Sequence, residues 1–223
     1  MKNLNLIKRK EVWVITVKGW LVIGVIGMII LGSFAQTVHP FFAVTDPKRG
    51  EILVVEGWLP RYAIEKAVRE FKENGYRLII TTGGPIYSQL PCSDYENYAE
   101  LASAVLQDLQ ADPGKIVSVP APDVKKDRTY VSALILKRWL DKNRPEAKSL
   151  DLVTLGPHAR RSLILHKIAL GSDVSVGVIS VPNRAYDPNQ WWRYSQGVKT
   201  IINEVIGYVY TKLIFRPEKV SPA

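Results

Sequence analysis

Cysteine, histidine and methionine are scarce in this chain of 223 residues. It contains one cysteine, Cys92, three histidines and two methionines. A single cysteine excludes a disulfide within the chain, and so few cysteines and histidines leave no cluster with the spacing of a structural zinc site. The sequence therefore predicts neither a metal nor another cofactor, and packing must stabilise the fold.

Several familiar enzyme motifs are also missing. The chain has no G-x-S-x-G, no G-x-x-x-x-G-K-[ST], no G-x-G-x-x-G and no H-E-x-x-H. Their absence argues against a lipase-type hydrolase, a P-loop NTPase, a typical dinucleotide enzyme and a zincin-type peptidase. The basic residues do not form a stripe with aromatics between them, so we expect no binding of nucleic acid.

Positive charge exceeds negative charge in this sequence. The formal net charge is +9, of which residues 1–18 carry +4, and hydrophobic residues make up 47% of the chain. The length and hydrophobic content predict one globular domain with an appendage. The positive excess suits an anionic membrane surface or a phosphate-bearing ligand.

A long stretch without charge lies near the N-terminus. No Asp, Glu, Lys or Arg occurs from Gly19 to Thr45, and Gly19 to Val38 supplies the roughly 20 apolar residues that a membrane-spanning helix needs. The basic residues before it predict a cytoplasmic N-terminus and an extracytoplasmic, periplasmic main domain. The alternative is a signal peptide cleaved near Ser33-Phe34-Ala35. We favour a retained single-pass anchor, because the apolar and aromatic character continues beyond that point.

The sequence therefore divides into five segments. We expect a basic cytoplasmic tail at residues 1–18, a transmembrane helix at 19–39, a linker at 40–50, an α/β domain at 51–215 and a polar tail at 216–223.

Within the domain, short apolar runs alternate with helical patterns. The runs predict strands near residues 51–55, 77–81, 116–119, 150–155 and 174–181. A helix follows each strand, which predicts a Rossmann-like three-layer sandwich with a mostly parallel sheet.

Three of the expected helices carry specific predictions. Ser93 and Glu96 suggest a capping box for the second helix. Its expected buried face is Tyr95, Tyr98, Ala102, Val105 and Leu109, and that of the third helix is Val131, Leu134, Ile135 and Trp139. The last helix, 198–215, is expected to turn Ile201, Ile202, Val205, Val209 and Leu213 inward.

Chemistry-bearing residues follow four of the strands. Parallel sheets bind ligands beyond the carboxyl ends of their strands, where helix N-termini expose free N–H groups. The candidates there are Glu56, Gly57, Arg61, Thr82, Gly83, Gly84, Asp127, Arg128, Thr129, Gly156, His158 and Arg161. Glycines let a ligand approach the backbone, and arginines present a planar fork to phosphate or carboxylate. Together they predict an anion pocket, with phosphate the commonest anion handled this way.

Two of these residues are candidates for acid–base catalysis. Histidine is the side chain best suited to give or take a proton at neutral pH, so His158 is one candidate, and Glu56 could be the second acid–base group. The structural alternatives are a helix cap for His158 and a capped turn for Glu56. We expect Arg161 rather than Arg160 to face the crevice, because adjacent side chains on a helix diverge by about 100°. The other two histidines, His39 and His166, are interpreted as structural.

Trp191 and Trp192 precede the last helix. Such a pair covers the edge of a core or rests at a bilayer surface, and the sequence leaves both interpretations open.

The order of these motifs resembles the YdcF-like family, a domain of unknown function shared with the bacterial envelope proteins SanA and ElyC. The resemblance covers Glu51 to Gly171 and rests on the first strand with Arg61, on T-G-G at Thr82–Gly84, on D-R-T-Y-V-S-A at 127–133 and on V-T-L-G-P-H-A-R-R-S at 153–162. The last segment is similar to V-T-x-x-x-H-x-x-R and aligns His158 and Arg161 with that histidine and arginine. Arg128-Thr129 and Ser132 replace N-T-x-x-N, and Glu56 stands where the family often has a small residue.

The resemblance implies a Rossmann-like domain, often tethered by one N-terminal helix, that takes part in envelope or peptidoglycan biogenesis and handles a polyprenyl-phosphate lipid carrier. Our leading hypothesis is a domain that binds a phosphate-bearing envelope metabolite through Arg61, Arg128 and Arg161, with Gly83-Gly84 as cradle. An enzyme of this kind would carry out phosphoryl or glycosyl-phosphate hydrolysis or transfer. The alternatives are a non-catalytic assembly factor with partner proteins in the envelope, and a nucleotide- or S-adenosylmethionine-binding protein.

Overall fold

The structure is a computed structural model that describes residues 11–87 and 94–217. The chain divides into two compact units, with the boundary between Thr37 and Val38. The first unit holds most of one helix, and the second is the α/β domain.

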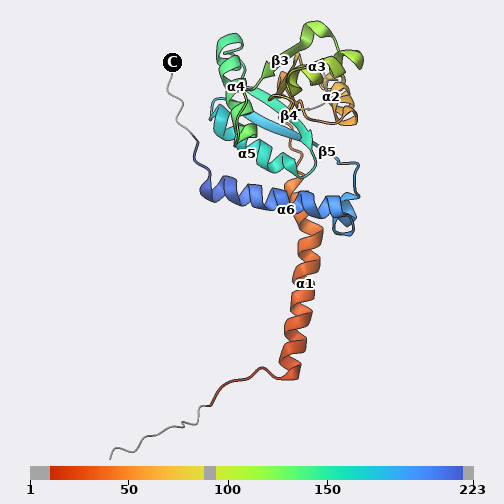
Figure 1. The fold of residues 1–223 in the computed structure, drawn as a ribbon, viewed down its shortest axis with the longest axis vertical. Coiled ribbons are helices and arrows are strands. Elements are labelled where there is room, and N and C mark those ends of the chain that lie inside the picture. Colours follow the sequence, from red (N-terminus) through yellow and green to blue (C-terminus); the bar gives the residue numbers. More distant parts are fainter. Residues whose placement is uncertain (1–10, 88–93, 218–223) are drawn as a thin grey trace, which may run out of the picture. The chain divides into compact units, whose positions relative to one another are not determined.

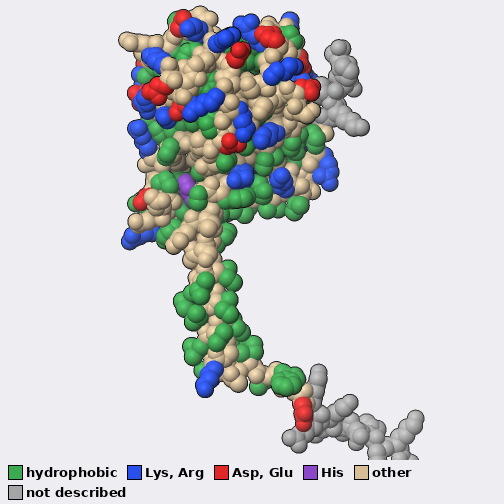
Figure 2. Space-filling model, turned by 180° about the vertical axis from the view of Figure 1, so that it is seen from behind, with side chains coloured by type: hydrophobic (Ala, Val, Ile, Leu, Met, Phe, Trp, Pro, Cys, Tyr) green, Lys and Arg blue, Asp and Glu red, His purple; other side chains and the backbone are tan. Residues whose placement is uncertain are grey.

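Helix α1, Val17–Phe42, is long and apolar enough to cross a membrane. Its 26 residues span about 39 Å at 1.5 Å per residue, which exceeds the roughly 30 Å hydrocarbon thickness of a bilayer. Hydrophobic side chains cover its surface (Figure 2). The helix continues past the expected end at residue 39 and includes Pro40, and its last turn belongs to the second unit.

The second unit contains a five-stranded, all-parallel sheet, as the sequence predicts. The strands are β1 Ile52–Glu56, β2 Leu78–Gly83, β3 Ile116–Pro120, β4 Ser149–Leu155 and β5 Ser175–Val181, in the order β3-β2-β1-β4-β5. The helices are α2 Arg61–Glu73, α3 Tyr98–Asp108, α4 Arg128–Asn143, α5 His158–Leu170 and α6 Ser195–Val209, and a π-helical turn, Tyr210–Ile214, extends α6. The order reverses between β1 and β4, which is where Rossmann-like sheets bind ligands.

Alternate residues of the central strands face two separate hydrophobic layers. Leu53 and Val55 pack with α2 and α3, whereas Ile52 and Val54 pack with α4 and α5. The sheet is therefore covered on both sides (Figure 1). This double burial explains why the strands read as continuous apolar runs rather than as alternating patterns.

The expected buried faces of α3 and α4 were only partly correct. Ala102 is buried as expected, and Val105, Leu109, Ile135 and Trp139 are partly buried and pack against the core. Helix α3 begins after Asn97, whose side-chain oxygen accepts a hydrogen bond from the backbone N–H of Glu100. The expected cap Ser93 lies outside the described residues. Tyr95 precedes the helix, and the buried residues are Ala99, Ala102 and Leu106. In α4, the buried residues are Tyr130, Ala133, Leu136 and Leu140, whereas the four expected residues are only partly buried.

The expected inward face of α6 was wrong for three of its five residues. Ile201 is buried and Val205 is partly buried, but Ile202, Val209 and Leu213 are exposed. The reason is the place of α6 in the fold. It packs against α5 and the neighbouring turns rather than across the sheet, so only a narrow face is covered.

The segment expected to be a linker is bound to the domain at residues 46–50. Asp46 pairs through its backbone with Val178 at the edge of the sheet. The buried carboxylate of Asp151 accepts hydrogen bonds from the backbone N–H groups of residues 48–50 and, at 2.8 Å, from the hydroxyl of Tyr76. Burial and this contact with the carboxylate raise the pKa of Tyr76. Residues 46–50 are therefore bound to β5 through the backbone of Asp46 and to β4 through the side chain of Asp151.

Candidate functional site

A cavity of about 730 Å³ opens at the carboxyl ends of the strands. It lies at the point between β1 and β4 where the strand order reverses, because Glu56 ends β1 and His158 begins the helix after β4. Its size falls in the usual range for small-molecule sites. The polar and aromatic residues of its lining include Glu56, Trp58, Thr82, Tyr98, Lys125, Lys126, Asp127, Arg128, Thr129, Ser132, His158, Arg161, His166, Thr200, Glu204 and Thr211.

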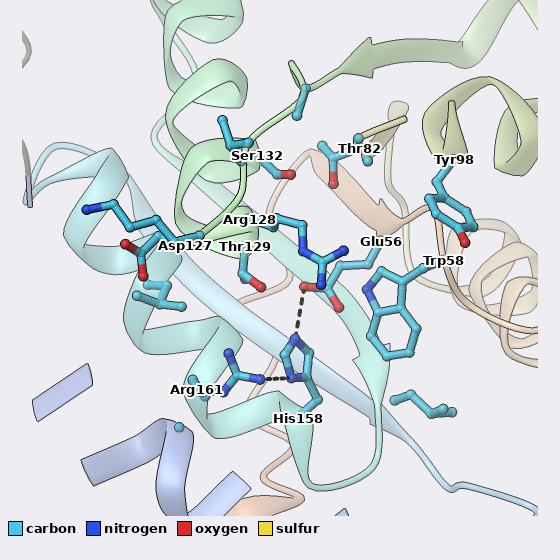
Figure 3. Close-up of a pocket in the computed structure, with 18 of the residues that line it drawn as sticks. Glu56, Trp58, Thr82, Tyr98, Asp127, Arg128, Thr129, Ser132, His158 and Arg161 are labelled. Atoms are coloured by element: carbon cyan, nitrogen blue, oxygen red, sulfur yellow. Dashed lines mark hydrogen bonds and ion pairs between the residues drawn. The ribbon is translucent and has the colours of Figure 1, made fainter. Parts of the chain in front are cut away.

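Glu56 is a buried carboxylate whose two oxygens both accept hydrogen bonds. Thr154 donates to one oxygen at 2.5 Å, and Ser162 donates to the other. The His158 Nε2 atom lies 3.9 Å from the oxygen that Ser162 contacts (Figure 3). These hydroxyls fix the orientation of the carboxylate, and they replace the water that an ionised group loses on burial.

His158 stands at the first position of α5, between two carboxylates. Its Nδ1 atom is 3.0 Å from an oxygen of Glu204 and 3.0 Å from a guanidinium nitrogen of Arg161. Trp58 packs edge-on against the ring, with 5.4 Å between centroids. When Nδ1–H donates to Glu204, the histidine ring is fixed so that Nε2 faces the cavity and Glu56. This arrangement orients one ring nitrogen for proton transfer.

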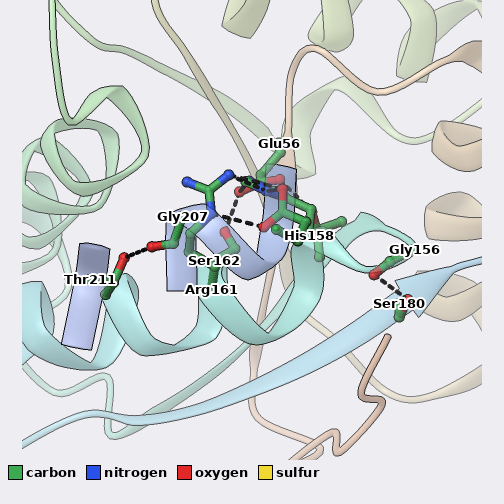
Figure 4. Close-up of polar contacts among 10 residues, drawn as sticks. Glu56, Gly156, His158, Arg161, Ser162, Ser180, Gly207 and Thr211 are labelled. Carbon is green, nitrogen blue, oxygen red and sulfur yellow. Dashed lines mark hydrogen bonds and ion pairs between the residues drawn. The ribbon is translucent and has the colours of Figure 1, made fainter. Parts of the chain in front are cut away.

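Glu204 forms an ion pair with Arg161, which lies beside His158 (Figure 4). Arg161 donates from Nε at 2.8 Å and from Nη2 at 3.0 Å, one bond to each oxygen of Glu204. Burial opposes ionisation of Glu204, but hydrogen bonds from His158 and Arg161 outweigh burial and lower its pKa to about 2. Glu204 is therefore ionised at neutral pH. Gly207 permits this contact, because a Cβ there would lie 2.7 Å from Arg161 Nε.

The start of α4 brings positive groups to the opposite wall. Arg128 extends its guanidinium into the cavity toward Glu56 and His158, and Thr129 and Ser132 point into it from the same helix (Figure 3). Among the residues that the structure describes, Arg128 forms no ion pair. No side chain caps this helix at Asp127, so its first N–H groups add partial positive charge beside Lys125 and Lys126.

Among the described residues, two buried polar side-chain atoms in the cavity lining have no hydrogen-bond partner. They are Thr82 Oγ1 and His166 Nε2, and both residues are 1% exposed. His166 holds its other nitrogen 2.8 Å from the carbonyl of Ser162, so Nδ1–H donates and Nε2 is left as an acceptor. Burial lowers the pKa of His166. Buried polar groups are normally satisfied, so these two atoms mark places for a ligand or water.

The structure brings nine of the twelve predicted site residues to this cavity: Glu56, Thr82, Gly83, Gly84, Asp127, Arg128, Thr129, His158 and Arg161. It does not bring three others there. Arg61 pairs with Asp108 at 2.5 Å on the outside of α2 and α3, and Gly57 and Gly156 lie outside the lining. Gly57 packs so closely on the carbonyl of Tyr98 that a Cβ would collide with it. Arg160 also lies elsewhere, since it donates to the carbonyl of Phe41 and stacks on its ring.

Sequence reasoning missed Glu204, Ser162 and Thr154, and it assigned His166 a structural role. Glu204 was the one acidic residue in the pattern of the last helix, and that signal could have identified it. Ser162 follows His158 by four residues on one face of α5, so helical spacing pointed to it.

Within residues 11–87 and 94–217, no group of three or more His, Cys, Asp or Glu side chains could hold a metal ion. In comparison with known proteins, the chain matches no family model and no curated protein.

Proposed function

We propose that the cavity binds the phosphate group of a small or lipid-linked ligand. The observation that carries this proposal is the state of Arg128. It enters the cavity at the start of an uncapped helix and has no ion pair within the described part of the chain. Arg161, by contrast, already pairs with Glu204. An unpaired guanidinium beside helix N–H groups provides the forked donors that phosphate oxygens accept.

The neighbouring groups support this assignment. Lys125 and Lys126 line the same wall, and Gly84 leaves the backbone open because a Cβ there would have only ordinary contacts. Glu56 places its carboxylate in the cavity, and this group would repel an anion placed directly against it. The favoured position for phosphate is therefore near Arg128 and Thr129, with the remaining part of the ligand toward Glu56, Thr82 and His166.

The same arrangement supports hydrolysis of a phosphate ester. Water would attack phosphorus, the bond from phosphorus to the leaving oxygen would break, and His158 Nε2–H would donate a proton to that oxygen. The attacking water would pass one proton to a phosphate oxygen, and His158 would regain a proton from the product phosphate or from solvent. Glu204 would hold the ring through Nδ1. Both oxygens of Glu56 already accept hydrogen bonds, so its assigned part is to position His158 and ligand hydroxyls.

We assign the protein to the membrane-anchored proteins of envelope biogenesis. The helix α1 and the resemblance to YdcF-like proteins support this setting, and a polyprenyl phosphate is the ligand that suits both. Nucleotides are a second candidate because the cavity lies where Rossmann-like sheets bind them.

The binding test is calorimetric titration of the full chain in detergent micelles with inorganic phosphate, farnesyl phosphate and a nucleotide monophosphate. Loss of a charged hydrogen-bond partner costs about 1.5–3 kcal/mol, so Arg128→Ala should weaken phosphate binding about 10- to 100-fold. Arg138→Ala is the matched control, because Arg138 lies on the same helix outside this cavity.

Equal affinity in the wild type and in Arg128→Ala, or no binding of any phosphate probe, would contradict the proposal. The catalytic part is tested separately by release of farnesol from farnesyl phosphate. We expect His158→Ala to abolish release while binding remains, and turnover equal to wild type in that variant would reject a catalytic His158.

A further inference from the structure

The outward face of α6 carries a continuous hydrophobic stripe. Ile202, Ile206, Val209 and Leu213 are 51%, 63%, 45% and 69% exposed. Their spacing of four, three and four residues places them on one side of the helix and its π-helical extension. Exposure of four large aliphatic side chains along one helix face is unfavourable in water, and soluble monomers rarely have such a patch. This stripe therefore marks an interaction surface.

The charges beside the stripe have one sign. Between residues 192 and 217 the exposed charged side chains are Arg193, Lys199, Lys212 and Arg216, and the only acidic residue, Glu204, is buried against Arg161. Two exposed aromatic residues, Trp192 and Tyr194, precede the helix. An apolar face with basic and aromatic borders is typical of helices that lie in a membrane interface.

The end of the apolar helix α1 contacts α6 directly. The rings of Phe41 and Phe42 lie 5.7 and 5.6 Å from the ring of Tyr208, measured between centroids. Arg160, at the start of α5, stacks on Phe41 with 4.0 Å between the guanidinium carbon and the ring centre. A helix that spans a bilayer ends at its surface, so these contacts hold α6 near that surface.

We infer that α6 docks on the lipid bilayer through the Ile202–Leu213 stripe, with its basic residues at anionic headgroups. The inference requires that α1 spans the membrane. It does not depend on what occupies the cavity.

Docking of α6 would place the cavity next to the membrane. The inner face of the same helix supplies Thr200, Glu204 and, in its extension, Thr211 to the cavity lining. One helix would therefore contact lipid on one side and hold His158 and Arg161 on the other.

The test uses the full chain with Cys92→Ser, reconstituted in phosphatidylcholine vesicles that contain a minority of phosphatidylglycerol. A nitroxide is attached at Ile206→Cys, at Leu213→Cys or, as the control, at Lys72→Cys on the exposed side of α2. Collisions with oxygen and with a water-soluble nickel complex are measured by electron paramagnetic resonance. We expect the two α6 labels to lie about 5–10 Å below the headgroups, with much stronger oxygen than nickel collisions. The Lys72→Cys label should show the reverse.

Nickel collisions at Ile206→Cys and Leu213→Cys equal to those at Lys72→Cys would show that water covers the stripe, and would overturn the inference. Spin–spin broadening between labelled chains at these positions, with protection from both reagents, would overturn it in favour of a second copy of the chain. Both labelled residues are exposed, so neither substitution removes core packing.

Discussion

Replacement of Glu204 by glutamine removes the charge that holds His158 and Arg161 in place. The carboxylate ordinarily titrates near pH 4.5, and its pKa in the folded protein is about 2. The difference between these two pKa values corresponds to about 3 kcal/mol of stability at neutral pH. Loss of one partner of a buried ion pair costs about 3–5 kcal/mol, and the side chain of Arg161 is 24% exposed and can regain some hydration. We therefore expect Glu204→Gln to lose about 3 kcal/mol.

The pH dependence gives a second, independent readout. A carboxylate with a lowered pKa contributes its full stability above its unfolded pKa and loses that contribution as the pH falls through the folded pKa. Wild-type stability should therefore decline between about pH 4.5 and pH 2. Glu204→Gln should lack this part of the decline.

The assay is urea unfolding of the full chain in detergent micelles, followed by tryptophan fluorescence at several pH values. Glu73→Gln is the matched control, since Glu73 is exposed on α2. A loss below about 0.5 kcal/mol in Glu204→Gln, the range usual for surface substitutions, together with an unchanged acid profile, would refute the reasoning.

Three further predictions concern the same framework. Gly207→Ala should lower the free energy of unfolding by about 1 kcal/mol, because the new Cβ would displace the Arg161 guanidinium from its ion pair with Glu204. In an Arg161→Ala background the same substitution should raise the free energy of unfolding by about 0.5–1 kcal/mol, because alanine favours a helix more than glycine does. A change of the same sign in both backgrounds would contradict the packing argument. Asp151→Asn should cost about 1–3 kcal/mol in urea unfolding, since an amide NH₂ would face donors from residues 48–50 or Tyr76, and an unchanged midpoint would count against this role. Because the pKa of His166 is lowered in the folded protein, its contribution to stability is fully present above pH 6.5 and is lost as the pH falls, since the unfolded chain takes up the proton first. His166→Asn can still donate to the Ser162 carbonyl and should make the free energy of unfolding depend less on pH in this range. An identical pH dependence in the variant would show that other groups cause the loss.

The sheet could be predicted from the sequence because the signals for its strands lie within short stretches of the chain. Runs such as Leu53–Val55 are buried on both faces, and each is followed by a helix with a clear stop, as at Gly171 after α5. These signals predict a parallel sheet covered on both sides. Helix positions were less accurate, since Asn97 caps α3 where a pattern at residues 93–96 had suggested an earlier start.

The candidate site could be predicted only in part. Residues directly after strands, such as Thr82 and His158, reach one edge by topology alone. Glu204 comes from a helix that crosses this edge, and its partnership with Arg161 spans 43 positions in the chain, so no local pattern contains it. The outward face of α6 was misread for a related reason, because a hydrophobic face was assumed to meet the sheet.

The claim that a phosphate group binds beside Arg128 is tested most directly by a crystal structure of the full chain grown with tungstate, a phosphate analogue with strong anomalous scattering. We predict one dominant anomalous peak within hydrogen-bond distance of the Arg128 guanidinium and the first turn of α4. An empty cavity at saturating tungstate, or peaks confined to surface lysines, would contradict the account.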